Sequence, residues 1–473
     1  MSATNFTTLF KPPMIIRFFV LSIVLSIIVS ATAQDATSYE LLKDDSILKK
    51  QYFDISMKKK EQLLRSVGKE YAKDYKEIYE LQFTEIGKLW SSSRPITSTT
   101  TNNYLQSIVK KIIDVNPELQ GNDARIVFSR DWWPNAVSMG DGSIVINAGL
   151  VTGMDNEAEI VFVICHELAH YYLEHTQNSI RKVVTQQNSE EFKKEVKRLS
   201  KEQYRVNEQY NKLFNSISFD SRRHSRENEA EADRFAFHFL KNTGYSADAI
   251  NTCLIKLDRI DDSLLTAPLY LERVFNFTSY PFNNKWVKEE SSIFSGINKS
   301  ESTLTKEEKD SLKTHPECSK RMEWLADSIT KISGQGKNFL VDSVYFNSIR
   351  KDFALEIMEQ CYRDENLSRN LYFAIEYLNR HPDNPVAVYN IGRALNDLYM
   401  LQRDHKMGYT IDPEKRTYSP EYNRLLKMLV KIRLSELGDL AYYFIRQYDP
   451  VMKGYPGYQD LLVTAIENRR NKE

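Results

Sequence analysis

Two histidines and a glutamate have the spacing of metal-binding residues on a helix. The run 161–170 reads V-F-V-I-C-H-E-L-A-H, which places His166 and His170 four residues apart with Glu167 beside the first. Residues i and i+4 lie about 40° apart around a helix, so both imidazoles face one point and can hold Zn²⁺. Zinc lowers the pKa of a bound water from about 15.7 towards 7, and the neighbouring Glu167 carboxylate can take its proton. We therefore predict one zinc ion per chain and Glu167 as the general base.

The helix that carries this pattern is expected to be buried. Residues 160–165, directly before His166, are all apolar. A helix that is apolar on every side lies inside a protein, which disfavours the alternative of two histidines on an exposed helix face. The site should therefore face an interior or a cleft.

Zinc needs a third protein ligand. The pattern H-E-x-x-H-x-x-G-x-x-H is absent, because Leu173 and Thr176 stand at its Gly and final His positions. His175 lies about 180° from His166 if one helix continues through both residues. Glu190 has the separation typical of a thermolysin-like third ligand, but no supporting Asp follows it.

A better third ligand lies in the run 227–233, which reads E-N-E-A-E-A-D. Glu229 and Asp233 are four apart on a predicted helix over about 225–241, so they share one face. Glu229 can bind the metal while Asp233 accepts a hydrogen bond from a ligand imidazole. Glu231 points about 160° away from Glu229 and should be solvated or paired with an arginine. The alternative is an ordinary acidic helix face.

The periodicity of the chain predicts an α+β fold that is mainly α. Strands are expected at 124–128 and 143–147, the second after a tight Gly140–Gly142 connection. Residues 262–300 look like an irregular surface segment. Helical patterns cover 38–92, 103–114, 156–175, 189–213, 225–241, 301–332 and most of the chain after 337.

These elements suggest four parts and one linker. The parts are a signal peptide (1–33), an N-terminal helical segment (34–92), a domain that carries the predicted zinc site (93–332) and a helical domain (338–473), with 333–337 as the linker. Residues 381–395 resemble the junction of two tetratricopeptide repeats, where the small Gly392 and Ala394 allow close helix packing. A plain helical bundle is the alternative for this last domain.

The first forty residues predict export. Lys11 and Arg17 accompany an apolar run over 18–29, and residues 31–33 read A-T-A, an A-x-A cleavage site ending at Ala33. The run is short for a membrane span, so an uncleaved anchor is the weaker alternative. We expect a periplasmic or secreted chain with at most peripheral membrane association.

Composition excludes two classes of protein. Lys+Arg and Asp+Glu are both 64 in 473 residues, and a nucleic-acid-binding protein normally has a basic excess. Four cysteines are too few for a disulfide scaffold.

Four segments together resemble the minimal gluzincin family, which includes the CAAX prenyl endopeptidase, HtpX-like proteases and BepA-like proteases. Two of these segments are the histidine run 161–170 and the acidic run 227–233. The other two are residues 133–150, which resemble the family's N-A-f-x-x-x-G-g-x-I-x-v-x-x-G-L segment, and residues 314–321, which resemble T-H-P-x-x-x-x-R. The resemblance covers about 80–330. It implies a zinc endopeptidase with His166, His170 and Glu229 as ligands and Glu167 as base.

The closest branch is expected to be the soluble, exported BepA-like one, because residues 177–220 are polar where integral-membrane members have spanning helices. The expected partners are polypeptide substrates, namely misfolded or misassembled envelope proteins, and envelope proteins that bind the helical domain. The alternative is a latent protease that acts mainly as a tetratricopeptide-type interaction protein or chaperone.

The strand over 143–147 is expected to be the edge strand that pairs with extended substrate in such a fold. Its residues are Ser143, Ile144, Val145, Ile146 and Asn147. The residue that helps zinc stabilise the oxyanion stays open between Tyr171, His224 and a residue of 262–300.

His315 has two interpretations. The resemblance to BepA-like proteases places it where an imidazole can plug the fourth zinc position and keep the enzyme latent. The alternative is a histidine at a helix start that packs locally.

Overall fold

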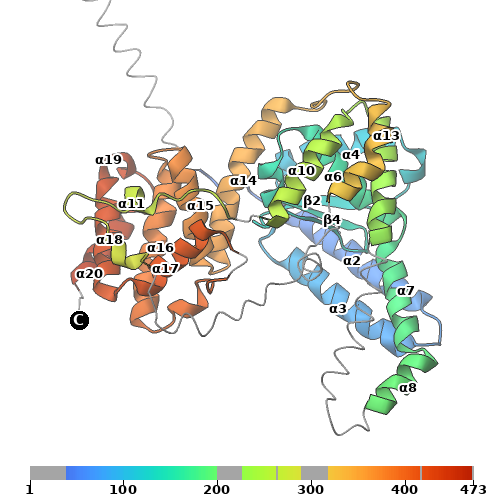
Figure 1. Ribbon diagram of the computed structural model, residues 1–473, viewed down its shortest axis with the longest axis horizontal. Helices are drawn as coiled ribbons and strands as arrows, with labels where there is room; N and C mark the ends of the chain where they lie inside the picture. Colours follow the sequence, from blue (N-terminus) through green and yellow to red (C-terminus); the bar gives the residue numbers. More distant parts are fainter. Residues whose placement is uncertain (1–38, 200–225, 263–264, 289–317, 416–417, 471–473) are drawn as a thin grey trace, which may run out of the picture.

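The computed structural model describes residues 39–199, 226–262, 265–288, 318–415 and 418–470. These residues form two lobes that lie side by side, with α14 (Ser343–Arg363) between them (Figure 1). The predicted signal peptide, His224 and His315 lie outside the described residues. Within the described ranges, no helix combines the length and the apolar character needed to cross a lipid bilayer.

One four-stranded sheet lies in the first lobe, in the order β1-β2-β4-β3. β2 and β4 are parallel, and the two outer pairs are antiparallel. The strands are β1 (Pro95–Ile96), β2 (Arg125–Ser129), β3 (Ala136–Ser138) and β4 (Ser143–Asn147).

The strand predicted at 143–147 is confirmed with the same bounds, but the expectation that it is an edge strand is wrong. Gly140 and Gly142 have φ of 80° and 96°, values that favour glycine, and they turn the chain back so that β3 pairs with β4 as a hairpin. β4 therefore lies between β2 and β3, and the short β3 forms the edge.

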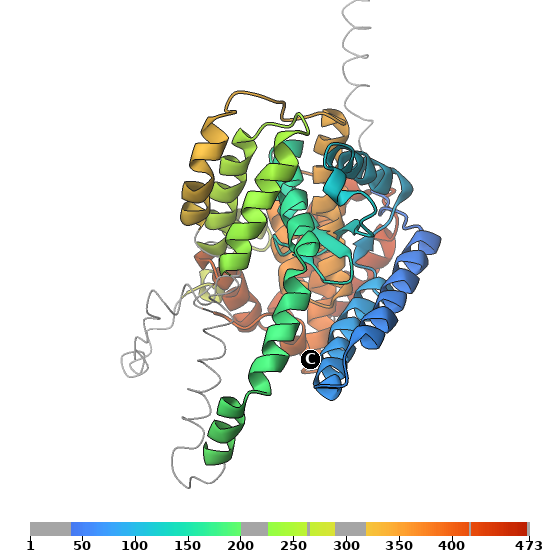
Figure 2. The same cartoon turned by 90° about the vertical axis from the view of Figure 1, so that its right-hand side faces the viewer.

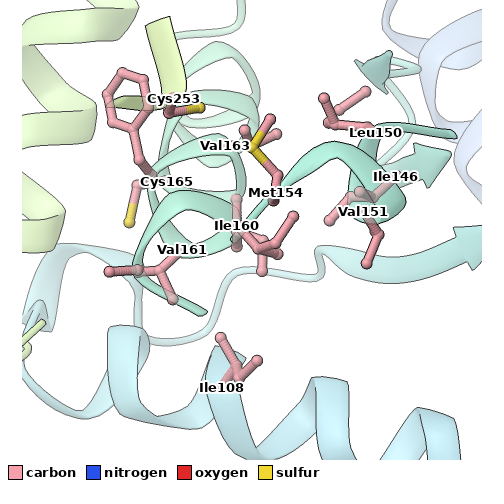
Figure 3. Packing of buried hydrophobic residues seen from close by; sticks show 14 of the residues in the cluster. Ile108, Ile146, Leu150, Val151, Met154, Ile160, Val161, Val163, Cys165 and Cys253 are labelled. Carbon is pink, nitrogen blue, oxygen red and sulfur yellow. The ribbon is translucent and has the colours of Figure 1, made fainter. Parts of the chain in front are cut away.

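Both faces of the sheet are covered, because alternate residues of its central strands point to opposite sides. Val127 and Val145 pack against the hairpin of α2 (Ser46–Ser66) and α3 (Ala72–Ser91). The neighbouring isoleucines of β2 and β4 join the main core with α4 (Thr99–Asp114) and α6 (Glu157–Tyr172). Figure 3 shows α6 residues in this core with Ile108 and Ile146 near them.

The helix predicted over 156–175 ends early. α6 stops at Tyr172, and Glu174 adopts a left-handed φ of 53° before α7 (His175–Gln187) begins. α7 and α8 (Glu190–Leu199) then project from the lobe (Figures 1 and 2).

The remaining helices of the first lobe surround α6. They are α5 (Ala148–Gly153), a helix over 226–241, α10 (Asp248–Asp262) and α13 (Cys318–Thr330), with a short 3₁₀ turn η1 (Pro117–Leu119). The mainly helical α+β class is confirmed for the described residues.

The second lobe is all helical. Gly392 packs against Ile445 and Leu461, so the close approach expected there is confirmed, whereas the tetratricopeptide assignment stays a prediction. Its elements are α15 (Leu367–Arg380), α16 (Pro385–Arg403), η3 (Met407–Tyr409), α17 (Pro420–Lys431), α18 (Leu434–Gln447), α19 (Asp449–Met452) and α20 (Tyr458–Arg470).

Residues 265–288 are irregular as predicted, but they are not simply a surface segment. They contain only α11 (Leu271–Val274) and η2 (Asn284–Trp286), and their Leu269, Phe275 and Trp286 are buried in the core of the second lobe.

The predicted linker 333–337 is held against the first lobe. The Lys337 amide donates to Gly244 O, and the Ser246 amide donates back to Lys337 O. α14 then contributes residues to the cores of both lobes, including Phe353 to the first and Met358 to the second.

Glu157, at the start of α6, connects α6 to the segment before α14 through hydrogen bonds. It is fully buried, and burial alone would raise its pKa, but backbone amides of 340–342 hold the pKa below its ordinary value. Its carboxylate accepts from Tyr104 Oη, Tyr245 Oη and the amides of Leu340, Val341 and Asp342.

We expect Glu157→Gln to lower the free energy of unfolding at pH 7 by about 2–4 kcal/mol. The NH₂ group of the glutamine would face the hydroxyl and backbone N–H groups that now donate to the carboxylate. Because its folded pKa is depressed, Glu157 stabilises the fold above its unfolded pKa, near 4.3, and loses this effect as pH falls. The deficit of the variant, measured by urea unfolding, should therefore shrink at pH 3–4. Glu61→Gln, in an exposed pair with Arg65, should cost about 0.5 kcal/mol or less.

Candidate active site

The predicted metal ligands converge on one point. His166 and His170 come from α6, and Glu229 comes from the helix over 226–241. The two Nε2 atoms are 3.1 Å apart, and Glu229 carboxylate oxygens lie 3.4 Å from His166 Nε2 and 3.3 Å from His170 Nε2. In the described part of the chain, this is the only group of three or more His, Cys, Asp or Glu residues that could hold a metal ion.

The spacing of these atoms fits zinc. Tetrahedral Zn²⁺ with ligand bonds of about 2.0–2.1 Å requires its ligand atoms to lie about 3.3–3.4 Å apart. The three observed separations fall at or close to this value. Two imidazoles and one carboxylate, with a fourth position left open, are also the donor set of several catalytic zinc sites.

Asp233 contacts His166, the contact that the i, i+4 spacing of Glu229 and Asp233 led us to expect. Its Oδ1 lies 2.9 Å from His166 Nδ1, so it can accept the imidazole proton and leave Nε2 for a metal. Arg321 of α13 binds the same carboxylate through Nε and Nη2, both at 2.7 Å. Arg321 lies in the T-H-P-x-x-x-x-R segment, but its partner could not be inferred from the sequence.

The acidic neighbours of His166 favour the protonated form of its imidazole. Burial opposes protonation of His166, yet hydrogen bonds to Asp233 and Glu229 outweigh it and raise its pKa to about 10. Burial also opposes the charged form of Asp233, but the Arg321 guanidinium holds the pKa of that carboxyl well below its ordinary value. Asp233 therefore stays an acceptor.

The expectation for His175 needs correction, whereas that for Glu231 holds in part. The Glu231 side chain is 44% exposed, as expected for a solvated residue, and among the described residues its Oε2 lies 3.2 Å from His175 Nε2. His175 in turn has its Nδ1 2.9 Å from His170 Nδ1. The angle predicted for His175 assumed one continuous helix, and the break at Glu174 carries the residue to the other side of His170.

Glu190, the alternative third ligand, begins α8 and is not part of the possible metal cluster among the described residues, which favours Glu229. Tyr171 Oη donates to Asp123, while its ring lines the cavity of about 330 Å³ beside His170.

Glu167 lies next to the candidate metal ligands. It is 5% exposed and adjacent to His166 on α6. Among the residues that the structure describes, none forms a hydrogen bond or ion pair with its carboxylate. Its oxygens therefore stay available to a water or a substrate amine.

An open strand edge lies next to α6, which packs along β3. Met139 N donates to Ser143 O, and Asn147 N donates to Asn135 O. In an antiparallel pair the hydrogen-bonded residues alternate, so Val137, which lies opposite Val145, directs its backbone N–H and C=O towards β4. Ala136 and Ser138 therefore direct their backbone N–H and C=O groups away from β4. In the described ranges, no hydrogen bond to these groups is found.

We expect Glu229→Ala to abolish stoichiometric zinc binding, because two imidazoles alone do not make a stable site. Asp233→Ala should weaken zinc affinity about 10- to 100-fold, as loss of a ligand's hydrogen-bond partner does. Glu190→Ala is the matched control and should keep its zinc. Metal content after dialysis measures all three, and zinc retained by Glu229→Ala would contradict the ligand assignment.

Comparison with known proteins agrees with this geometry. Residues 99–329 match the family model of Peptidase family M48. The matched segment begins at the start of α4 and ends within α13, so it includes His166, His170, Glu229 and Arg321. No curated protein matches the chain. Residues 99–329 are therefore similar to Peptidase family M48, whose members are zinc-dependent metallopeptidases.

Proposed function

We propose that this chain is a zinc metalloendopeptidase that cleaves extended polypeptides. The observation that carries the proposal is the convergence of His166, His170 and Glu229 beside an open strand edge. A strand edge binds main chain, and main-chain pairing does not depend on one particular side chain. An internal segment of a polypeptide can lie along such an edge, which favours an endopeptidase.

The chain's own residues would act as follows. Zinc bound by the three ligands supplies a Lewis acid that polarises the scissile carbonyl and acidifies the attacking water. Glu167 takes a proton from that water and passes it to the leaving amine, which separates as a neutral group. Asp233 keeps His166 in the tautomer whose Nε2 faces the metal.

The substrate strand is reassigned to β3. Ala136 and Ser138 offer outward-facing donors and acceptors, whereas the backbone of β4 is already paired on both sides. A change such as Val145→Pro would disrupt the sheet itself and would not report on substrate binding.

We further propose that the chain is exported and that misfolded or misassembled envelope proteins are its substrates. The apolar run over 18–29 with the A-x-A site after it supports export. Low side-chain selectivity at a strand edge suits the cleavage of unfolded chains.

One observation favours the alternative of a partner-binding protein with little turnover. A groove of about 710 Å³ lies between α5, α14 and α15. Its apolar walls include Trp132, Phe373 and Tyr377. A groove of this size and lining suits a ligand or a peptide segment.

We expect Glu167→Gln to bind zinc as the wild type does and to lose casein cleavage by about 10³-fold or more, since general base catalysis typically contributes about 10²–10⁴-fold. Metal content and cleavage are measured on the same preparations. Wild-type protein that binds zinc but cleaves neither casein nor itself would favour the partner-binding alternative.

We expect Ser138→Pro to lower kcat/KM about 10-fold while zinc stays bound, because it removes one outward N–H without touching the β3–β4 bonds. Ser138→Ala is the control and should cleave normally, because it keeps the N–H and the Ser138 Oγ has no hydrogen-bond partner among described atoms. Equal activity of the two variants would mean that β3 does not bind substrate.

A further inference from the structure

His170 has a support of its own, separate from Asp233. His175 is 5% exposed and places its Nδ1 2.9 Å from His170 Nδ1, on the side of the ring away from Nε2. Its other nitrogen, Nε2, lies 3.2 Å from Glu231 Oε2. Glu231, His175 and His170 thus form a chain of contacts that ends at the metal-binding atom.

Only one arrangement of protons satisfies this chain when His170 is a ligand. A metal on His170 Nε2 leaves the ring proton on Nδ1, which must then donate to His175 Nδ1. Because His175 Nδ1 accepts, its own proton sits on Nε2 and points at the Glu231 carboxylate. Each hydrogen bond therefore fixes the next tautomer, and His170 presents a lone pair at Nε2.

His175 reaches this position because of the break between α6 and α7. The left-handed backbone at Glu174 redirects the chain, and such conformations in residues other than glycine often occur at functional sites. The start of α7 is then fixed against the β3–β4 turn. Gln177 Nε2 donates to Gly140 O, and Thr176 lies so close to Gly140 that a side chain there would collide with it.

We propose that His175 and Glu231 are positioning residues that orient His170 for zinc, as Asp233 and Arg321 orient His166. The proposal rests on the metal site of the proposed function. On this assignment one helix, over 226–241, supplies the ligand Glu229, the acidic partner Asp233 of His166 and the acidic partner Glu231 of His175. It also gives the third histidine of H-E-x-x-H-x-x-x-x-H a role without making it a ligand.

The test compares residues that can and cannot accept the His170 proton, in the full-length protein. His175→Leu fills the space but cannot accept, whereas His175→Asn places an amide oxygen near the position of Nδ1. We expect His175→Leu to weaken zinc affinity about 10- to 100-fold in competition with a chelator, and His175→Asn to recover most of that loss. Glu231→Gln keeps an acceptor for His175 and should lose less than His175→Leu.

One further measurement, with a control variant, separates positioning from packing. In Co²⁺-substituted protein, His175→Leu should shift the visible absorption bands, because the ligand field changes when His170 tilts. His238→Leu is the matched control: His238 pairs with Glu118 at 2.7 Å on the surface, so its loss should leave metal affinity and spectrum unchanged.

Three results would overturn the proposal. His175→Leu could bind zinc as tightly as the wild type. His175→Asn could lose as much affinity as His175→Leu, which would indicate packing alone. Wild-type protein could hold two metal ions and His175→Leu one, which would make His175 a ligand. Zinc binding with these variant effects but without cleavage by the wild type would sink the proposed peptidase and leave the positioning role standing.

Discussion

The buried ion pair between Asp233 and Arg321 holds the metal site together. Both side chains are almost completely removed from water, so each would be costly to bury without the other. The two-point contact fixes the carboxylate, and that carboxylate fixes the ring of His166. Three elements meet there: α6, the helix over 226–241 and α13. Their relative positions set the distance between His166 and Glu229, and hence the fit to zinc.

α6 can carry these polar residues because the rest of it is apolar on every side. Residues such as Ile160 and Ile164 pack against the sheet and the surrounding helices, which leaves the helix no freedom to rotate. Rotation by one residue would move His166 by about 100° and separate it from Glu229. Core packing thus positions the ligands, and the hydrogen bonds behind them set their orientation.

The sequence was sufficient for those parts of the site that local periodicity determines. His166, His170, Glu229 and Asp233 follow from i, i+4 spacing, and β4 follows from a short apolar run. It was not sufficient where one residue changes the chain direction: the left-handed Glu174 gives no pattern, so the position of His175 was missed.

Contacts between residues far apart in the chain could not be predicted from the sequence either. Arg321 meets an Asp 88 positions earlier, and nothing local indicates which acid an arginine will find. The edge strand was misassigned because β3 has only three residues, with Val137 exposed between partly or fully buried neighbours. Residues 265–288 look irregular in the sequence because their apolar side chains pack against the helices of the second lobe and not against each other.

The second lobe contacts the segment that leads into β3, the edge strand of the sheet. Trp132, four residues before β3, packs against Phe373 of α15, and Arg369 lies 4.5 Å from the centre of its ring. On its other side, the Trp132 carbonyl is so close to Gly149 of α5 that no side chain could fit there. Any shift of α15 relative to α5 must therefore move this segment, and β3 follows it directly. Because α14 is also part of both cores, the helical lobe is packed directly against the first lobe and is not tethered to it by a free linker.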